Sequence, residues 1–338
     1  MMTISLCMIV KNEEAVLGRC LDTVCDLVDE IIIVDTGSTD DTKQIAAKYT
    51  DKIYDFVWAD DFSAARNFAF SKATMDYIYS ADADEVLDAV NRERFRILKE
   101  HLVPEIEIVQ MKYGNQLCHG TVYNFDEEYR PKLFKRLREF TWIYPVHETV
   151  RLDPVVYDSD IVITHMPFEE HGGRDLSIFR RETKDGKILP AHLHNMYAKE
   201  LLMVGEKEDI LSAKEYFEMV CLAGQSTSDM YEECYAVLCT AAVYARDAAL
   251  LLKYATKSVA GEGCSEVCYA LGEYYETVND LQEAILWYYN AAFETAPILR
   301  KDTGDDKPLA ALARVYETLG DTENADVYRK MLEERNQN

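Results

Sequence analysis

The chain is short of basic residues. It contains 36 Lys and Arg against 61 Asp and Glu, which gives a net charge of −25 at pH 7. This balance excludes nucleic acid as a partner, because a phosphate backbone is bound by stripes of Lys and Arg. The same charge repels a bare diphosphate, so a site for such a ligand needs a local cation: a metal ion, an arginine, or both.

Long hydrophobic runs, an export signal and paired cysteine motifs are also absent. No apolar segment reaches the about 18 residues that cross a bilayer, and the first one, 4–10, lacks the layout of a cleavable signal. The nine cysteines are scattered and odd in number, with no Cys-x-x-Cys spacing. We therefore expect reduced thiols in a cytoplasmic protein without a membrane span.

Glycine-rich phosphate loops are missing as well. The first predicted strand runs into Lys11-Asn12-Glu13-Glu14 and not into Gly-x-Gly-x-x-Gly, which argues against a dinucleotide-dependent dehydrogenase. A nucleotidyltransferase is disfavoured for the same reason, because that class normally has a glycine-rich basic loop after its first strand.

Strand and helix signals alternate through the first half of the chain. Apolar strands are predicted over 3–10, 30–35, 52–57 and 76–80, and the helices between them over 13–28, 38–49 and 62–73. Ser38 or Thr39 is the expected N-cap of the second helix. Strands that are apolar throughout and separated by helices predict an α/β fold with a mostly parallel sheet covered on both faces. Shorter β segments are expected over 106–112, 129–135, 155–157 and 161–164.

A cluster of basic residues lies within and just after the predicted β segment 129–135. Its members are Arg130, Lys132, Lys135, Arg136 and Arg138. The sequence leaves two interpretations open, a solvated edge of the sheet or a contact to an acceptor or a phosphate.

After Gly172-Gly173 the pattern is helical to the end, which predicts two domains, 1–172 and 173–338. Residues 270–284 are echoed by 311–325: each has an apolar helix, a short turn closed by Asp, and an Ala where the next helix packs closely. These segments resemble tetratricopeptide repeats, and hairpins over 192–222 and 230–258 extend the array. Tyr275 and Tyr316 are 41 residues apart, more than the about 34 of that repeat, so 297–307 should loop out. Either a concave peptide-binding face or a plain helical buttress fits this pattern.

Polar side chains follow the predicted strands at the ends that a parallel sheet brings together. Lys11 and Asn12 follow the first strand, Asp35 ends the second, and Asp82 and Asp84 follow the fourth. Alternate residues of an extended chain share a face, so Asp82 and Asp84 should converge if the strand continues. Two carboxylates are a half-site for Mg²⁺ or Mn²⁺, which complete their shell with water and substrate phosphates. Ligands gather at this edge of α/β sheets, so we expect a nucleotide diphosphate site there.

Four segments in this order carry a family resemblance: 4–14, 33–40, 61–67 and the Asp-Ala-Asp-Glu of 82–85. Together they resemble family 2 glycosyltransferases of the GT-A fold. The helical second half is similar to the bacterial branch with C-terminal tetratricopeptide-like helices, to which the peptide S-glycosyltransferases of bacteriocin clusters look related. The resemblance implies a UDP-sugar donor, a peptide, protein or glycan acceptor, and a divalent Mg²⁺ or Mn²⁺.

The resemblance also implies roles for residues of these segments. Asp35 would hold the nucleotide base, while Lys11, Asn12 and Glu13 would shape the pocket for base and ribose. Arg66 and Asn67 would face the nucleotide, Arg66 opposing the charge of the diphosphate. Asp82 would lie near the ribose and the metal, and Asp84 would ligate the metal. Two simpler interpretations stand beside these: Glu13 favours the N-terminus of a helix, or Arg66 forms a surface ion pair with Asp60 or Asp61.

The segment Pro145-Val146-His147-Glu148 resembles the later His-Glu element of the same family. By that resemblance Glu148 is the catalytic base that deprotonates the acceptor, and His147 either orients Glu148 or binds metal. His165, after the last predicted strand, is a second candidate metal ligand. The family usually has a small residue shortly before His-Glu, whereas this chain has Trp142-Ile143-Tyr144-Pro145, a departure that bears on the acceptor pocket.

The resulting hypothesis is a metal-dependent, inverting glycosyltransferase. It would move a hexose or N-acetylhexosamine from a UDP-sugar to an acceptor hydroxyl or thiol. The alternative is a non-catalytic scaffold, in which the helical array binds a peptide and the α/β domain is a relic. Intact Asp35, Asp82 and Asp84 argue against that alternative.

Overall fold

The structure, a computed structural model, describes residues 2–114, 128–150, 154–166, 174–184, 186–224 and 226–335. The chain divides into two compact units, Met1–His171 and Gly172–Asn338. The domain boundary expected at 172/173 lies outside the described residues. Within the described part of the chain, no helix has both the length and the apolar character that crossing a bilayer requires.

The first unit is built on an eight-stranded sheet with the order β3-β2-β1-β4-β7-β6-β10-β5. β1 is parallel to β2 and β4, β2 to β3, and β6 to β10, while β7 is antiparallel to both of its neighbours and β5 to β10. The predicted α/β class with a mostly parallel sheet is therefore confirmed. The strands are β1 Ile4–Val10, β2 Glu30–Asp35, β3 Ile53–Asp55, β4 Tyr77–Ser80, β5 Glu85–Val86, β6 Ile108–Gly114, β7 Glu128–Lys135 and β10 Val156–His165, with β8 Trp142–Ile143 and β9 Thr149–Val150 in a separate two-stranded sheet.

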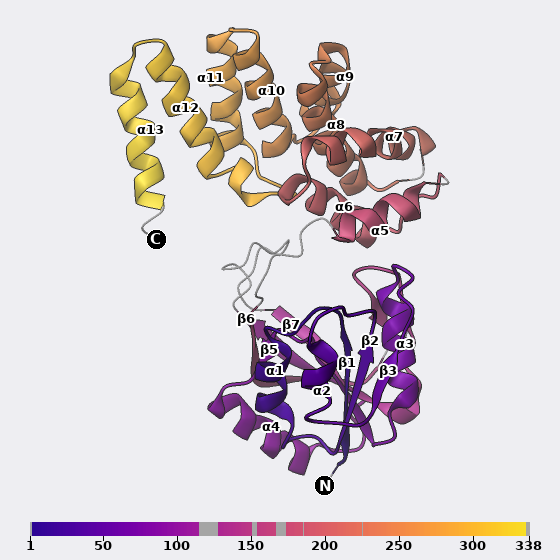
Figure 1. The fold of residues 1–338 in the computed structure, drawn as a ribbon. Helices are drawn as coiled ribbons and strands as arrows, with labels where there is room; N and C mark the ends of the chain where they lie inside the picture. Colours follow the sequence, from indigo (N-terminus) through magenta and orange to yellow (C-terminus); the bar gives the residue numbers. More distant parts are fainter. Residues whose placement is uncertain are drawn as a thin grey trace. The chain divides into compact units, whose positions relative to one another are not determined.

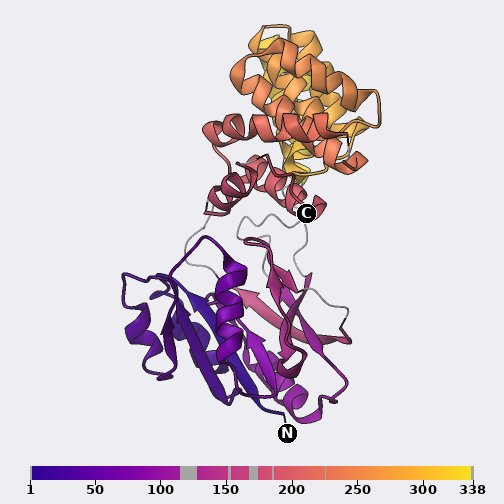
Figure 2. The ribbon, with the colours of Figure 1, turned by 90° about the vertical axis from the view of Figure 1, so that its right-hand side faces the viewer.

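Helices cover both faces of this sheet (Figure 1). On one face, α1 (Leu17–Val24), α2 (Thr42–Ala46) and α4 (Ala89–His101) bury apolar side chains with Leu6, Met8 and other strand residues. On the other face, α3 (Phe62–Lys72) packs on β1 and β2 (Figure 2). Trp142 belongs to the apolar cluster on this face. Strand residues are apolar on both faces because each face meets its own helical layer.

Several predicted elements are shorter in the structure. The helix expected over 13–28 spans only Leu17–Val24, and the one expected over 38–49 spans only Thr42–Ala46. The N-cap prediction was wrong, because Ser38 Oγ accepts from the backbone N–H of Asn12 and caps no helix. The strand expected over 52–57 narrows to β3, while the segments 155–157 and 161–164 belong to one strand, β10.

The second unit consists of helical hairpins, as predicted (Figure 1). In the last two hairpins the turn is closed alike: Asp280 N–H donates to Tyr275 O at 2.9 Å, and Asp321 N–H donates to Tyr316 O at 3.0 Å. Ala284 and Ala325 are fully buried, which confirms the close-packing positions of the repeat. The helices are α5 Arg174–Thr183, α6 Ala191–Met203, α7 Lys207–Ala223, α8 Ser228–Ala245, α9 Ala248–Val259, α10 Ser265–Thr277, α11 Leu281–Tyr289, α12 Asp306–Thr318 and α13 Thr322–Arg335.

The inserted segment before α12 is held by a buried carboxylate. Glu266, on α10, is 2 % exposed and accepts the backbone N–H groups of Ile298, Leu299 and Arg300 at 2.8–3.2 Å. A buried irregular segment needs partners for its N–H groups, and Glu266 supplies three of them. The expected loop between the repeats is thus an ordered part of the helical unit.

We expect Glu266→Ala to lower the free energy of unfolding of the helical unit by about 3 kcal/mol, because three backbone N–H groups, that of Leu299 fully buried, lose a charged acceptor. Thermal and urea unfolding followed by far-UV circular dichroism measure the change. Glu262→Ala, which removes an exposed carboxylate near the start of the same helix, is the control. Equal stability of the two variants would contradict this role of Glu266.

Candidate active site

The predicted site residues lie at the carboxyl ends of neighbouring strands. β2 and β4 flank β1, and Val10 is in register with Asp35. His165 ends β10, which is parallel to β6 and pairs with Glu85 of β5. Since strands lie about 4.8 Å apart, the ends of β2 and β4 are separated by roughly 10 Å across the end of β1. The sheet therefore brings the candidate residues to one edge.

The loops after β1 and β2 are joined through Asn12. This residue has a left-handed backbone with φ 56°, its Oδ1 accepts from Thr39 N–H at 2.8 Å, and its N–H donates to Ser38 Oγ at 2.9 Å. Glu13 N–H donates to Thr42 Oγ1 at 2.7 Å, and Lys11 is exposed at the rim. Asn12 and Glu13 thus fix the shape of this rim through backbone and side-chain bonds between two loops.

Asp35 is buried, and only one of its two carboxylate oxygens accepts hydrogen bonds within the described residues. The residue is 1 % exposed, and Oδ1 accepts the N–H groups of Gly37 and Ser38 at 2.9 and 3.0 Å. Gly37 makes this turn with φ 105°, a conformation that favours glycine. Oδ2 is buried and has no hydrogen-bond partner within the described residues. A buried carboxylate oxygen without a donor is costly, so this atom suits an N–H group supplied by a ligand.

Arg66 lies between two candidate carboxylates. From α3 its Nη2 donates to Asp82 Oδ1 at 3.0 Å, its Nε donates to Glu148 Oε1, and its Nη1 donates to Ser80 Oγ at 3.0 Å. Burial lowers the pKa of the guanidinium, but the charges of Asp82 and Glu148 outweigh burial and hold this pKa above its ordinary value. The simpler interpretation, a pair with Asp60 or Asp61, was wrong: Asp61 caps α3 by accepting from Ala64 N–H.

Asp82 is ionised by its surroundings. Burial raises the pKa of its carboxyl, but Arg66 and then Lys132 attract the charged form more strongly and hold the pKa well below its usual range. The side chain nevertheless stays 38 % exposed. Asp82 is therefore a charged carboxylate that a ligand can reach.

Asp84 pairs with His165 and not with Asp82. Its Oδ2 lies 3.0 Å from His165 Nε2, and its carbonyl accepts from Met166 N–H at 2.9 Å. The expectation that both carboxylates share a face of one continuing strand was wrong, because β4 ends at Ser80 and the chain turns at residues 83–84. The turn directs Asp82 to Arg66 and Asp84 to the end of β10.

The residues Asp82, Asp84 and His165 fit a divalent ion only as a partial site. Within the described ranges no group of three or more His, Cys, Asp or Glu is placed to hold a metal by itself. Carboxylate oxygens suit Mg²⁺ or Mn²⁺, and Mg²⁺ is commonly held by one or two carboxylates together with substrate phosphates and water. The donor set therefore fits an ion that arrives with a phosphorylated ligand.

The loop that carries His147 and Glu148 is tied to α3. Asn67 donates Nδ2–H to Trp142 O at 3.0 Å and accepts from Trp142 N–H at 2.8 Å, and Phe62 N–H donates to Pro145 O at 3.0 Å. In this structure both the nitrogen and the oxygen of the Asn67 amide bind the loop. Tyr144 and His147 have φ values of 75° and 47°. Such a backbone is unfavourable for these residues and persists only when the surroundings hold it.

A buried ion pair beneath this edge was missed by the sequence analysis. Lys132 of β7 is 5 % exposed and binds Glu85, the residue after Asp84. Burial raises the pKa of Glu85 to about 7, against the opposing charge of Lys132. No local signal marks this pair, because its members are 47 residues apart and Lys132 lies within a basic cluster.

The other members of the basic cluster also bind the chain's own groups. Lys135 and Arg136 donate to the carbonyls of Pro104 and Met75, and Arg130 and Arg138 pair with carboxylates of the same unit. Neither of the two interpretations offered for this cluster describes it as a whole.

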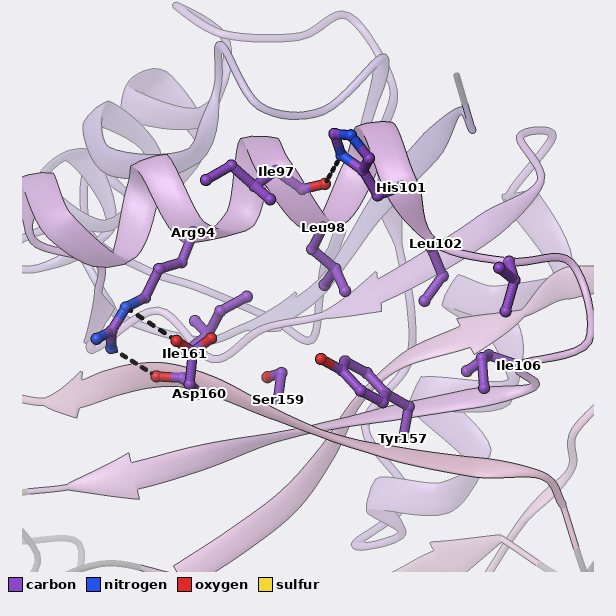
Figure 3. A pocket seen from close by; sticks show the side chains of 11 residues that line it. Arg94, Ile97, Leu98, His101, Leu102, Ile106, Tyr157, Ser159, Asp160 and Ile161 are labelled. Carbon is purple, nitrogen blue, oxygen red and sulfur yellow. Dashed lines mark hydrogen bonds and ion pairs between the residues drawn. The ribbon is translucent and has the colours of Figure 1, made fainter.

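A cavity of about 300 Å³ lies apart from these residues, between α4 and the first half of β10 (Figure 3). Leu98, Leu102 and Ile161 line it, and the ion pair of Arg94 with Asp160 closes one end. Since β10 runs toward His165, this cavity is near the opposite edge of the sheet from the candidate site.

Residues 5–147 match the sequence model of "Glycosyl transferase family 2". The N-terminal domain belongs to this family. Its mostly parallel sheet agrees with the α/β class that the sequence predicts. The sequence segments that carried the resemblance lie in the matched range except for Ile4, together with His147, whereas Glu148 and His165 follow it.

The named relatives of this chain include one repeat-containing protein and several glycosyltransferases. A TPR repeat-containing protein of Synechococcus elongatus is 54 % identical over 152 residues, 44 % of this chain and 36 % of that protein. An uncharacterised glycosyltransferase of Rickettsia prowazekii is 27 % identical over 179 residues, 48 % of this chain and 56 % of that protein. The SPbeta prophage-derived glycosyltransferase SunS of Bacillus subtilis is 40 % identical over 92 residues, 27 % of this chain and 22 % of that protein. The chain thus spans little more than half the length of these relatives at most.

Among solved structures, glucosyl-3-phosphoglycerate synthase of Mycobacterium tuberculosis, in complex with Mn²⁺, UDP and phosphoglyceric acid, aligns with a TM-score of 0.42 and 17 % identity. The alignment covers 56 % of this chain and 80 % of that one.

We expect Asn67→Ala to loosen the loop of the glycosyltransferase domain that carries Glu148. Two hydrogen bonds to Trp142 are lost, each worth about 1 kcal/mol, so amide hydrogen exchange in 142–148 should become faster and the unfolding temperature should fall. Gln44→Ala removes an exposed amide of the same domain and should change neither. Unchanged exchange in 142–148 would show that Asn67 does not hold the loop.

Proposed function

We propose that the chain is a metal-dependent, inverting glycosyltransferase of the cytoplasm. It would transfer a hexose or N-acetylhexosamine from a UDP-sugar to a hydroxyl or thiol of a peptide, protein or glycan. In the described residues eight cysteines are free thiols, which supports a reducing compartment. The helical hairpins are the proposed place for binding a peptide acceptor.

The open oxygen of Asp35 is the observation that carries this proposal. The buried carboxylate is fixed by Gly37 and Ser38, and its Oδ2 is available to the imide N–H of a uracil base. Lys11, Asn12 and Glu13, on the neighbouring loop, would form the walls for base and ribose. A pocket that hydrogen-bonds one base edge discriminates strongly against bases that leave the buried group unpaired.

Asp82, Asp84 and His165 are the residues proposed to hold Mg²⁺ or Mn²⁺. The ion would offset the charge that develops on the departing diphosphate. Asp84 Oδ2 and His165 Nε2 lie 3.0 Å apart. The side chain of Asp82 is partly exposed to solvent. Asp35 ends β2 and Asp82 follows β4, and these two strands are the neighbours of β1. This placement supports one ligand whose base lies at Asp35 and whose diphosphate lies near Asp82.

Glu148 is the proposed catalytic base. An inverting transfer needs a carboxylate that takes the acceptor proton while the acceptor attacks the anomeric carbon from the side opposite the leaving diphosphate. Glu148 is the carboxylate that Arg66 holds next to Asp82, which supports this assignment. His147, with its constrained backbone, is proposed to orient Glu148.

Base recognition is tested by thermal shift with UDP-, GDP- and dTDP-sugars in the presence of Mn²⁺. A ligand at a hundred times its Kd should raise the unfolding temperature by about 5 °C or more. We expect this for UDP-sugars, and expect Asp35→Asn to lose most of it. Asp55→Asn, at the exposed end of β3, is the control. Equal shifts with GDP-sugars, or an undiminished shift in Asp35→Asn, would contradict the role of Asp35.

Metal dependence is tested with Asp84→Ala. We expect kcat for UDP release from a UDP-sugar to fall about 10²-fold or more, because the departing diphosphate loses its counter-charge. Glu93→Gln, an exposed acid on α4, should be unaffected. Turnover that is undiminished in excess EDTA, or full activity of Asp84→Ala, would remove the metal assignment.

A further inference from the structure

Each nitrogen of the Arg66 guanidinium already donates a hydrogen bond to a group of the protein. Nε, Nη1 and Nη2 donate to Glu148, Ser80 and Asp82, respectively. The Cζ atom lies 5.3 Å from the centroid of the Trp142 ring. The proposed function nevertheless requires a cation against the diphosphate. The inference that follows rests on that function and concerns how Arg66 becomes available.

Several basic side chains near this edge are already paired with carboxylates, whereas Lys11 is exposed at the rim. Lys132 binds Glu85, Arg130 binds Glu128, and Lys43 binds Asp55. A diphosphate that takes the Nε edge of Arg66 has to displace the Glu148 carboxylate from it. Arginine binds phosphate and carboxylate through the same fork of donors, so the two anions compete directly.

We propose that Arg66 exchanges Glu148 for the donor diphosphate, so that donor binding releases the catalytic base. Before donor binding, Arg66 holds Glu148 and Asp82 together. When the diphosphate takes the Nε edge of the guanidinium, Glu148 loses its cationic partner and its carboxylate is free to accept the acceptor proton. Arg66 is thus a positioning residue that couples the donor side of the site to the acceptor side.

The loop around Glu148 can stay in place during this exchange. Asn67 and Phe62 bind it at Trp142 and Pro145, independently of Arg66. Only the ion pair has to change, and the Glu148 carboxylate remains at the rim. The exchange predicts an order of events in which the base is competent only in the donor complex.

The coupling is measured by calorimetric titration of UDP with Mn²⁺ into wild type, E148Q, R66Q and the double variant. Removing the competing carboxylate should tighten UDP binding by about three- to tenfold, the equivalent of part of one charge-assisted hydrogen bond. R66Q should weaken binding, and E148Q should give no gain in the R66Q background, because the benefit passes through Arg66. E139Q removes an exposed charge from the preceding turn and controls for the general field.

Each other outcome has a distinct meaning. Unchanged or weaker UDP binding by E148Q, with normal binding by wild type, overturns the exchange and leaves the proposed function intact. Two further results would contradict it: E148Q also tightens UDP binding in the R66Q background, or E139Q tightens it as much as E148Q does. Either result shows a general effect of charge and overturns the exchange. Absence of UDP binding by wild type removes the proposed function and the inference together. If E148Q does not fold, as judged by circular dichroism, E148A gives the same comparison.

Discussion

The candidate site depends on one guanidinium between two carboxylates. Asp82 follows β4 and Glu148 lies on a loop after β8, and without Arg66 these two like charges would repel each other at the rim. In water such a pair contributes little, but Arg66 and Glu148 are only 14 % and 13 % exposed, so the attraction is less screened. The position of the proposed base therefore follows from an arginine on the neighbouring helix.

The excess of acid in this chain explains much of the surrounding arrangement. Glu85 is buried against Lys132, and Asp82 gains stabilisation from the same lysine as well as from Arg66. Buried charges need partners because their desolvation is costly. Arg66 and Lys132 neutralise carboxylates near the site, so carboxylates and an anionic ligand would compete for the same cations.

Local patterns predicted the framework of the fold well, and contacts between distant segments decided the rest. The alternation of apolar strands and helices and the echoed hairpins around Ala284 and Ala325 were visible in the sequence. The extents of α1 and α2 were not, because Asn12, Ser38 and Thr39 bond across two loops and leave no residue to extend or cap a helix. The partners of Asp82 and Asp84 were not visible for a similar reason: Arg66 and His165 come from other elements.

By itself, the sequence determined the α/β class, the helical-repeat half, and the edge of the sheet at which Lys11, Asp35 and Asp82 gather. These follow from hydrophobic periodicity and from residue order, which are properties of short segments. Only the tertiary structure decided the pairing of Arg66 with Asp82 and Glu148, the burial of Lys132 with Glu85, and the use of Asn67 as a tether. Each of these joins residues far apart in the chain, and the energy of an ion pair or hydrogen bond depends on distance and burial that no local pattern contains.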